Sequence, residues 1–159
     1  ARGVCKERSG VTSVDFHFNT PDRLTHACRL VRKALRAQAA TDEKPLIVFC
    51  SDRARLEQFD ELLYSFSDED FLPHVHADHP LVDEAPIILS HQAYSPPMPR
   101  LPNILVNLDD AVPDFFTQFQ RVFEIVGPDE ADKELARARF TLYRDRGYAI
   151  TRHDLAAKG

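Results

Sequence analysis

The stretch Pro45-Leu46-Ile47-Val48-Phe49-Cys50-Ser51-Asp52 decides the fold class of this chain. Five apolar residues follow one another, without the alternation that a strand with one solvated face would show. Such a run predicts a short strand that is covered on both faces, as in a parallel sheet. Ser51-Asp52 then offers capping side chains, which predicts that a helix starts directly after the strand. The buried side of that helix is expected to carry Leu56, Phe59, Leu63 and Phe66.

A similar unit of strand and helix precedes this one. Val14 to Phe18 alternates between apolar and polar residues, and this period of two predicts a strand. Thr20-Pro21-Asp22 has the composition of a helix start, with Thr20 as the expected capping residue. The helix that follows is predicted to bury four residues at helical spacing, namely Leu24, Cys28, Val31 and Leu35.

Three more strands are predicted downstream. They are Pro86 to Leu89, Ile104 to Leu108 and, near the end of the chain, Tyr148 to Thr151. Between the first two lies a proline-rich stretch from Pro96 to Pro102. Proline cannot donate to a sheet, so a stiff loop is expected there.

Two more helices are predicted between the later strands. The first starts at Pro113-Asp114, and an apolar stripe carries it to its end before Gly127-Pro128. That stripe consists of Phe115, Phe119, Val122 and Val126, with Phe116 and Phe123 beside it. The second runs from Asp129 to Arg146, with acidic residues first and arginines last, as the helix dipole favours.

The order of these elements predicts an α/β sandwich with a largely parallel central sheet. The connections are short, so residues 11–159 are expected to form a single domain. Residues 1–10 are expected to be disordered or foreign to the native domain.

Composition excludes several classes of protein. No apolar run approaches the roughly 18 residues of a membrane helix, so an integral membrane protein is not expected. The net charge of −5 disfavours a generic binder of nucleic acid. The three cysteines are widely spaced and form neither a disulfide framework nor a zinc knuckle. A reducing cytoplasm is therefore the expected compartment.

Motifs for nucleotide binding are missing. Of the five glycines, none lies in a turn between a predicted strand and helix, so the dinucleotide and P-loop fingerprints are absent and no cofactor is expected. A zinc site built on His74, His76 and His79, with Asp78 and Asp83 nearby, is a weaker hypothesis than a polar loop.

The carboxylates Asp109 and Asp110 follow a predicted strand, where ligands often bind in parallel sheets. A role in capping the helix at Pro113 is the preferred interpretation of this pair. A small metal-dependent enzyme that uses His74, His76 and Asp109 remains the alternative to a non-enzymatic interaction domain.

The last predicted helix carries an unusual stripe for an acidic protein. Lys133, Arg137, Phe140 and Arg144 share one face, which would suit an acidic peptide that ends in an apolar residue. A merely solvated basic face is the alternative. Arg139 and Arg146 project between apolar residues, so they either pair with carboxylates at the core edge or are covered by another chain.

A second candidate interaction surface follows the helix after Asp52. It consists of Tyr64, Phe66, Phe71, Leu72 and Pro73, and exposed aromatic clusters commonly anchor protein partners. Closure of the core by Phe71 and Leu72 is an equally good interpretation.

From about Val14 to Leu155 the chain resembles the chi subunit of bacterial DNA polymerase III holoenzyme. The resemblance rests on the order and spacing of the following pieces: Val-Asp-Phe-His-Phe at 14–18, Cys-Arg-Leu at 28–30, Phe-Asp-Glu-Leu-Leu-Tyr at 59–64, Asp-Phe-Leu-Pro-His at 70–74, the runs at 86–89 and 104–108, Leu-Ala-Arg at 135–137, Tyr-Arg at 143–144 and Gly-Tyr at 147–148.

The resemblance implies a Rossmann-like, three-layer fold without a bound nucleotide. It also implies a non-catalytic subunit in the bacterial cytoplasm, which binds the psi subunit and does not contact DNA directly. The other implied partner is the acidic C-terminal tail of single-stranded DNA-binding protein, whose last residue is phenylalanine. An orphan domain that binds another acidic peptide is the further alternative.

By the same resemblance, Arg137 would hold the terminal carboxylate of the tail and Lys133 its aspartates. Phe140 and Val126 would line the pocket for its phenylalanine, with Thr141 and Arg144 completing the site. Tyr64, Phe71, Leu72 and Pro73 would face psi or an accessory helicase. Three positions depart from the family: Thr141 replaces a lysine of some members, Phe140 a tyrosine and Tyr64 a tryptophan.

Overall fold

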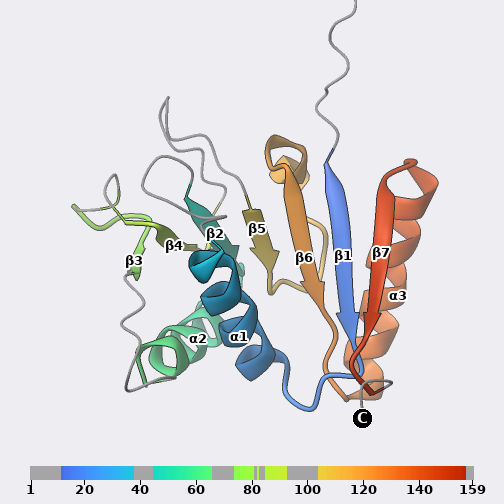
Figure 1. Ribbon diagram of the computed structural model, residues 1–159, viewed down its shortest axis with the longest axis horizontal. Coiled ribbons are helices and arrows are strands. Elements are labelled where there is room, and N and C mark those ends of the chain that lie inside the picture. Colours follow the sequence, from blue (N-terminus) through green and yellow to red (C-terminus); the bar gives the residue numbers. More distant parts are fainter. Residues whose placement is uncertain are drawn as a thin grey trace, which may run out of the picture.

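A seven-stranded, all-parallel sheet forms the centre of the molecule in the computed structural model (Figure 1). The structure describes residues 12–37, 45–65, 74–80, 82, 85–92 and 104–156. The strands lie in the order β3-β4-β2-β5-β6-β1-β7. Their bounds are β1 Ser13–Phe18, β2 Leu46–Phe49, β3 His74–His76, β4 Ile87–Ser90, β5 Ile104–Asn107, β6 Arg121–Ile125 and β7 Ala149–Asp154.

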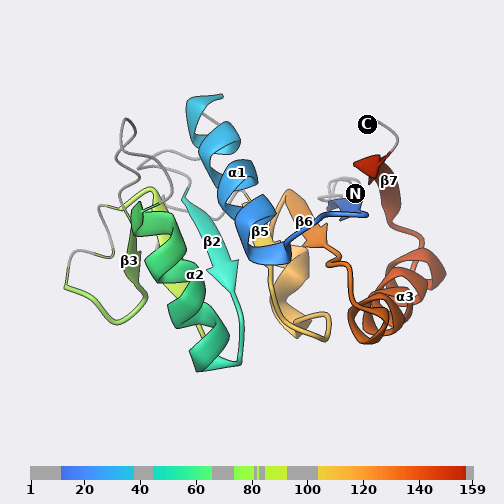
Figure 2. The ribbon, with the colours of Figure 1, turned by 90° about the horizontal axis from the view of Figure 1, so that it is seen from below.

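Helices cover both faces of this sheet (Figure 2). α1 (Arg23–Arg36) and α2 (Arg53–Ser65) lie on one face, and α3 (Glu130–Asp145) lies on the other with the short 3-10 helix η3 (Asp114–Gln118). This arrangement confirms the predicted α/β sandwich with three layers and a parallel sheet.

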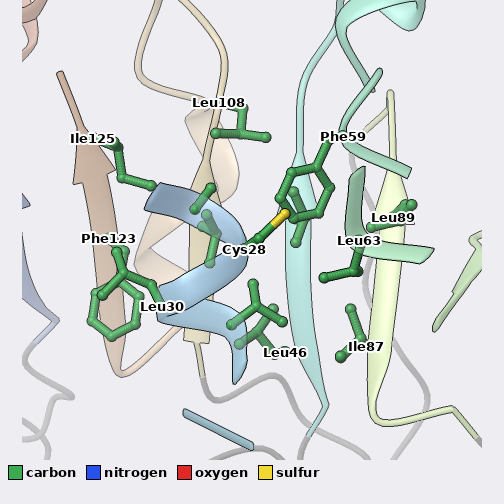
Figure 3. Packing of buried hydrophobic residues seen from close by; sticks show 14 of the residues in the cluster. Cys28, Leu30, Leu46, Phe59, Leu63, Ile87, Leu89, Leu108, Phe123 and Ile125 are labelled. Carbon is green, nitrogen blue, oxygen red and sulfur yellow. The ribbon is translucent and has the colours of Figure 1, made fainter. Parts of the chain in front are cut away.

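The buried run Leu46–Phe49 explains why two layers of helix are needed. Val48 packs into the cluster beneath α1 and α2, whereas Ile47 and Phe49 pack into the cluster beneath α3. Figure 3 shows the first cluster, in which Cys28 of α1 and Phe59 of α2 meet the strands. Burial of each such side chain contributes about 1.5–3 kcal/mol.

The predicted third helix is wrong beyond its first turn. Only Asp114–Gln118 is helical, and Arg121–Ile125 forms strand β6 between β5 and β1. In this strand Val122 packs under α3, while Phe123 and Ile125 pack under α1. The aromatic spacing fitted a helix equally well, but burial on both faces of the sheet is available only to a strand.

Two smaller features also differ from expectation. His74–His76, predicted as a loop, forms the edge strand β3 through pairing with Ile87–Leu89. Thr20 does not cap α1, because its hydroxyl donates to the carbonyl of Val126 at 2.7 Å. Asp22 caps α1 instead, and its carboxylate accepts from the backbone N–H of Leu24.

Several predictions lie outside the described residues. These concern residues 1–10, the proline-rich loop from Pro96 to Pro102, and the side chains of Phe66, Phe71, Leu72, Pro73 and Asp83. Within the ranges that are described, no helix has the length and apolar character needed to span a bilayer.

Candidate functional site

A cavity of about 560 Å³ opens between α3 and the strands β1 and β7. All six residues predicted for the acidic-peptide site line it: Val126, Lys133, Arg137, Phe140, Thr141 and Arg144. Phe16 and Phe18 of β1, Asn19 and Arg152 of β7 also line it, although no role was assigned to them from the sequence.

Helix α3 presents two different faces. Ala136, Arg139 and Tyr143 recur at intervals of three and four and are buried against the sheet. The stripe Lys133, Arg137, Phe140 and Arg144 runs beside that buried face and borders the cavity. The cavity therefore follows directly from the periodicity of the helix.

Aromatic and aliphatic groups make the floor of the cavity. The ring of Phe140 meets that of Phe16 edge-on, with centroids 5.3 Å apart. Phe16 and Val126 are almost completely buried below it. A floor of this kind can accept an apolar side chain from a ligand. Such binding removes apolar surface from water and leaves no polar atom buried without a hydrogen bond.

Cations make the rim of the cavity. Lys133 lies 3.6 Å from Glu130, Arg137 3.1 Å from Glu134 and Arg144 3.3 Å from Asp145. All three carboxylates are largely exposed, and such pairs contribute about 0–1 kcal/mol. The rim cations can therefore exchange these partners for the carboxylates of a ligand at little cost.

Arg152 adds a cation that the sequence did not place. Its guanidinium carbon lies 6.0 Å from the centre of the Phe140 ring, at the limit of a cation–π contact. The position results from the pairing of β1 with β7, which sets Arg152 beside Phe16. In the sequence, Arg152 was only a cation directly after the last predicted strand, which was expected to end at Thr151.

Arg139 pairs with a carboxylate of its own chain, which settles the alternative left open by the sequence. Its Nε donates to Oε1 of Glu124 at 2.8 Å, and both side chains are buried. Oε2 of Glu124 accepts from the Tyr143 hydroxyl and from Asn107, each at 2.8 Å. Burial, followed by the nearby Glu124 charge, raises the pKa of Tyr143. Arg146, in contrast, is exposed at the end of α3.

In such folds nucleotides usually bind at the carboxyl ends of the strands. In this protein the side chain of Arg23 joins two of these strand ends. Nε of Arg23 donates to the carbonyl of Ile125 at 2.8 Å, and Nη2 donates to that of Asp109 at 3.0 Å. Nη1 lies 3.3 Å from Asp132. Arg23 thus ties together the loops that follow β5 and β6.

The residues of the metal-site hypothesis do not come together. Nε2 of His74 and of His76 lie 2.7 Å and 3.0 Å from the two oxygens of Asp60. Asp109 follows β5, three strands away from β3, and accepts a hydrogen bond from Ser51 at 2.8 Å. Among the described residues, no group of three or more His, Cys, Asp or Glu side chains is placed to hold a metal ion.

The predicted capping role of Asp109-Asp110 is wrong. No side chain caps η3 at Pro113. Asp110 instead pairs with Arg55 of α2 at 3.1 Å, and its backbone carbonyl accepts from Arg139. The two carboxylates thus connect the end of β5 to the layer of α2.

Tyr64 is the one member of the second predicted surface whose side chain is described. It lies near the end of α2 and is 80% exposed. An aromatic ring at this exposure gains nothing from the core, so it is free to contact a partner.

The comparisons with known proteins agree with this architecture. The family model described as DNA polymerase III chi subunit, HolC, matches residues 11–151. The DNA polymerase III subunit chi of Pseudomonas aeruginosa is 34% identical over 149 residues, which cover 91% of this chain and 98% of that protein. The subunit chi of Escherichia coli is 29% identical over 131 residues, which cover 82% of this chain and 87% of that protein.

One solved structure supports the fold alone. The C-terminal domain of S. cerevisiae Dbp5 is similar with a TM-score of 0.53 and 12% identity, over 91% of this chain and 90% of that one. The family match and the relatives carry the assignment further. This chain belongs to the family of DNA polymerase III chi subunits.

Proposed function

We propose that this chi subunit is a non-catalytic accessory subunit of the bacterial replicase, and that its α3 cavity binds the acidic C-terminal tail of single-stranded DNA-binding protein. The observation that carries the proposal is the pairing of an apolar floor with a cationic rim in one cavity. A tail with several carboxylates and a terminal phenylalanine has the complementary chemistry.

Each part of the tail has a partner in this proposal. The phenylalanine ring enters the floor formed by Phe140 and Val126. Arg137, whose side chain is about two-thirds exposed, leaves Glu134 and binds the terminal carboxylate through two hydrogen bonds. Lys133 binds the aspartates at the end of the cavity nearer the start of α3, and Arg144 at the other end.

Thr141 and Phe140 limit the polar contacts that this site can make with the tail. Thr141 lines the cavity without adding a charge, and Phe140 has no hydroxyl with which to donate to the ligand. The proposed affinity therefore rests on the apolar floor and on the cations Lys133, Arg137 and Arg144.

The proposed role is one of coupling. Tyr64, together with Phe71, Leu72 and Pro73, would contact the psi subunit and through it the clamp loader, or alternatively an accessory helicase. α3 lies at the other end of the sheet from α2 (Figure 1). Because the cavity is lined by α3, β1 and β7, both partners could bind together. The replicase would thereby be held to coated single-stranded DNA in the bacterial cytoplasm, without a cofactor and without direct contact with DNA.

The test is a calorimetric titration with a short peptide ending Asp-Asp-Ile-Pro-Phe, at low and at moderate salt. We expect saturable binding that weakens as salt rises, because the rim charges are solvent-exposed. Arg137→Ala should weaken binding by about 2 kcal/mol, or roughly thirtyfold in Kd. Arg146→Ala is the matched control, because Arg146 is exposed on the same helix and does not line the cavity.

A second peptide without the phenylalanine separates this proposal from the orphan-domain alternative. Loss of binding for that peptide supports a tail-specific site. Equal binding of both peptides would show that the rim recognises acidic peptides in general, and wild-type affinity in the Arg137→Ala protein would overturn the assignment of Arg137.

A further inference from the structure

A second hollow, of about 310 Å³, lies on the face of the sheet opposite the α3 cavity. It is bounded by α1 and by the strands β1, β6 and β7. His17 follows Phe16 along β1, and His153 follows Arg152 along β7, so their side chains point to the other face. The two sites therefore share strands but no lining residues.

Three imidazoles meet in this hollow. The ring of His17 stacks on that of His153, with centroids 4.4 Å apart and an angle of 12° between the planes. Nδ1 of His17 lies 3.4 Å from Nε2 of His26 on α1. Each ring carries two N–H groups when it is protonated, so the cluster can supply donors to a ligand in the hollow.

Permanent cations surround the imidazoles. Arg29 and Lys33 of α1 and Arg121 of β6 line the same hollow. Arg121 lies 2.8 Å from Asp15, which also accepts from His153 at 3.2 Å. No ion pair joins Arg29 or Lys33 to a carboxylate within the described part of the chain, and the described residues that line the hollow include no acidic side chain.

The hollow is thus positively charged and gains charge as the imidazoles protonate. Burial, and then the neighbouring His153 and His26, lower the pKa of His17 to about 4. Burial and the nearby Arg29 lower the pKa of His26. The groups that face His17 are Asp15 on β1, His26 and Lys33 on α1, Arg121 on β6 and His153 on β7. Only Asp15 among them favours the imidazolium.

We propose that this hollow binds a tetrahedral dianionic oxyanion of the phosphate class, with Arg29 and Lys33 as its charge partners and the three imidazoles as donors. A bound dianion reverses the electrostatic balance that keeps His17 neutral. By linkage, binding raises the imidazole pKa values, and the affinity increases as the pH falls. The inference is independent of the proposed peptide site.

Sulfate is the probe for the first experiment, because it stays a dianion throughout the pH range used. Histidine Cε1–Hε1 resonances are followed by NMR during sulfate titrations at about pH 7.5 and about pH 5.5. We expect the three histidines to shift together with one dissociation constant. A rise of about one unit in one imidazole pKa on binding gives an affinity increase that approaches about tenfold only below the pKa of the free imidazole. For His17, whose pKa in the free protein is about 4, the increase at about pH 5.5 is therefore less than about twofold.

Matched variants test the site. The double substitution Arg29→Gln and Lys33→Gln removes both proposed charge partners and should abolish the saturable shifts. Two variants serve as controls, Arg36→Gln and Arg137→Gln. Arg36 is exposed in the last turn of α1 and does not line the hollow, and Arg137 lies on the opposite face of the sheet. Both controls should leave the histidine shifts unchanged.

Shifts that stay linear in sulfate, or that persist in the double variant, would overturn the proposal. In a final arm, inorganic phosphate or a phosphorylated oligothymidylate is added to the sulfate-bound protein as a competitor. Competition by phosphate alone assigns the site to a free ion, whereas competition by both assigns it to a phosphate group that a larger molecule can carry.

Discussion

Nε of Arg139 donates to Oε1 of Glu124 at 2.8 Å, and the two side chains are 2% and 0% exposed. The pair joins α3 to β6 and lies on the face of α3 that meets the sheet. The neighbouring stripe, with Arg137 and Phe140, is thereby placed on the wall of the cavity. A buried ion pair thus fixes the orientation of the proposed binding surface.

The Arg139→Met substitution should lower the free energy of unfolding by about 3–5 kcal/mol, because it leaves the Glu124 charge buried and unpaired. Chemical denaturation measures the loss. Adding Glu124→Gln to this variant should recover part of it, since no charge then remains. A loss below about 1 kcal/mol in Arg139→Met would contradict the prediction, and Arg146→Ala should change stability by no more than about 0.5 kcal/mol.

Phe140→Ala should weaken binding of the acidic peptide by about 1–3 kcal/mol while the fold is retained, because Phe140 is only half-buried and forms the apolar floor. Calorimetry with the phenylalanine-ending peptide measures this change. Leu135→Ala is the matched control, because Leu135 is 41% exposed on the same helix and does not line the cavity. Equal losses in both variants would mean that helix stability, not the floor, governs binding.

Thr141→Lys should strengthen peptide binding by about 0.2–1 kcal/mol, because it adds a cation to the cavity lining at an exposed position. The gain should disappear at high salt. Titrations of Thr141→Lys and Thr141→Gln at two salt concentrations separate the charge from the longer side chain. A gain that is the same for glutamine, or that survives at high salt, would refute the electrostatic explanation.

Folding stability should fall with acidity through His17. Burial and its imidazole neighbours lower the pKa of His17 from 6.5 to about 4. The unfolded chain therefore takes up a proton first, and the stabilisation that is present above about pH 6.5 is lost as the pH falls towards 4. Denaturation of the wild type and of His17→Phe in sulfate-free buffer measures this dependence. The variant should show a shallower decline over that range, and equal slopes would exclude His17 as the source.

Local patterns predicted a large part of the fold. The apolar run at 46–49 indicated a strand buried on both faces, and the structure places β2 near the middle of the sheet. Asp52 was expected to begin a helix, and its carboxylate accepts from the backbone N–H of Ala54 and Arg55. Both features depend on neighbours within a few residues, which is why the sequence alone reveals them.

The segment from Pro113 to Val126 shows where such patterns fail. Its apolar residues fit the period of a helix and the burial of a strand alike. Arg121–Ile125 forms a strand and not a helix because it pairs with β5 on one side and with β1 on the other. His74–His76 likewise forms a strand because it pairs with β4 at the edge of the sheet.

The stripe of Lys133, Arg137, Phe140 and Arg144 could be predicted from the sequence, because helical spacing is a local property. The completion of the cavity by Phe16 and Arg152 could not, since these residues come together through the pairing of β1 with β7. The tertiary structure was likewise needed to show that Arg139 pairs with Glu124 and not with another chain. Contacts between residues that are distant in the sequence leave no periodic pattern along the chain. They can therefore be seen only once the strands have paired into the sheet.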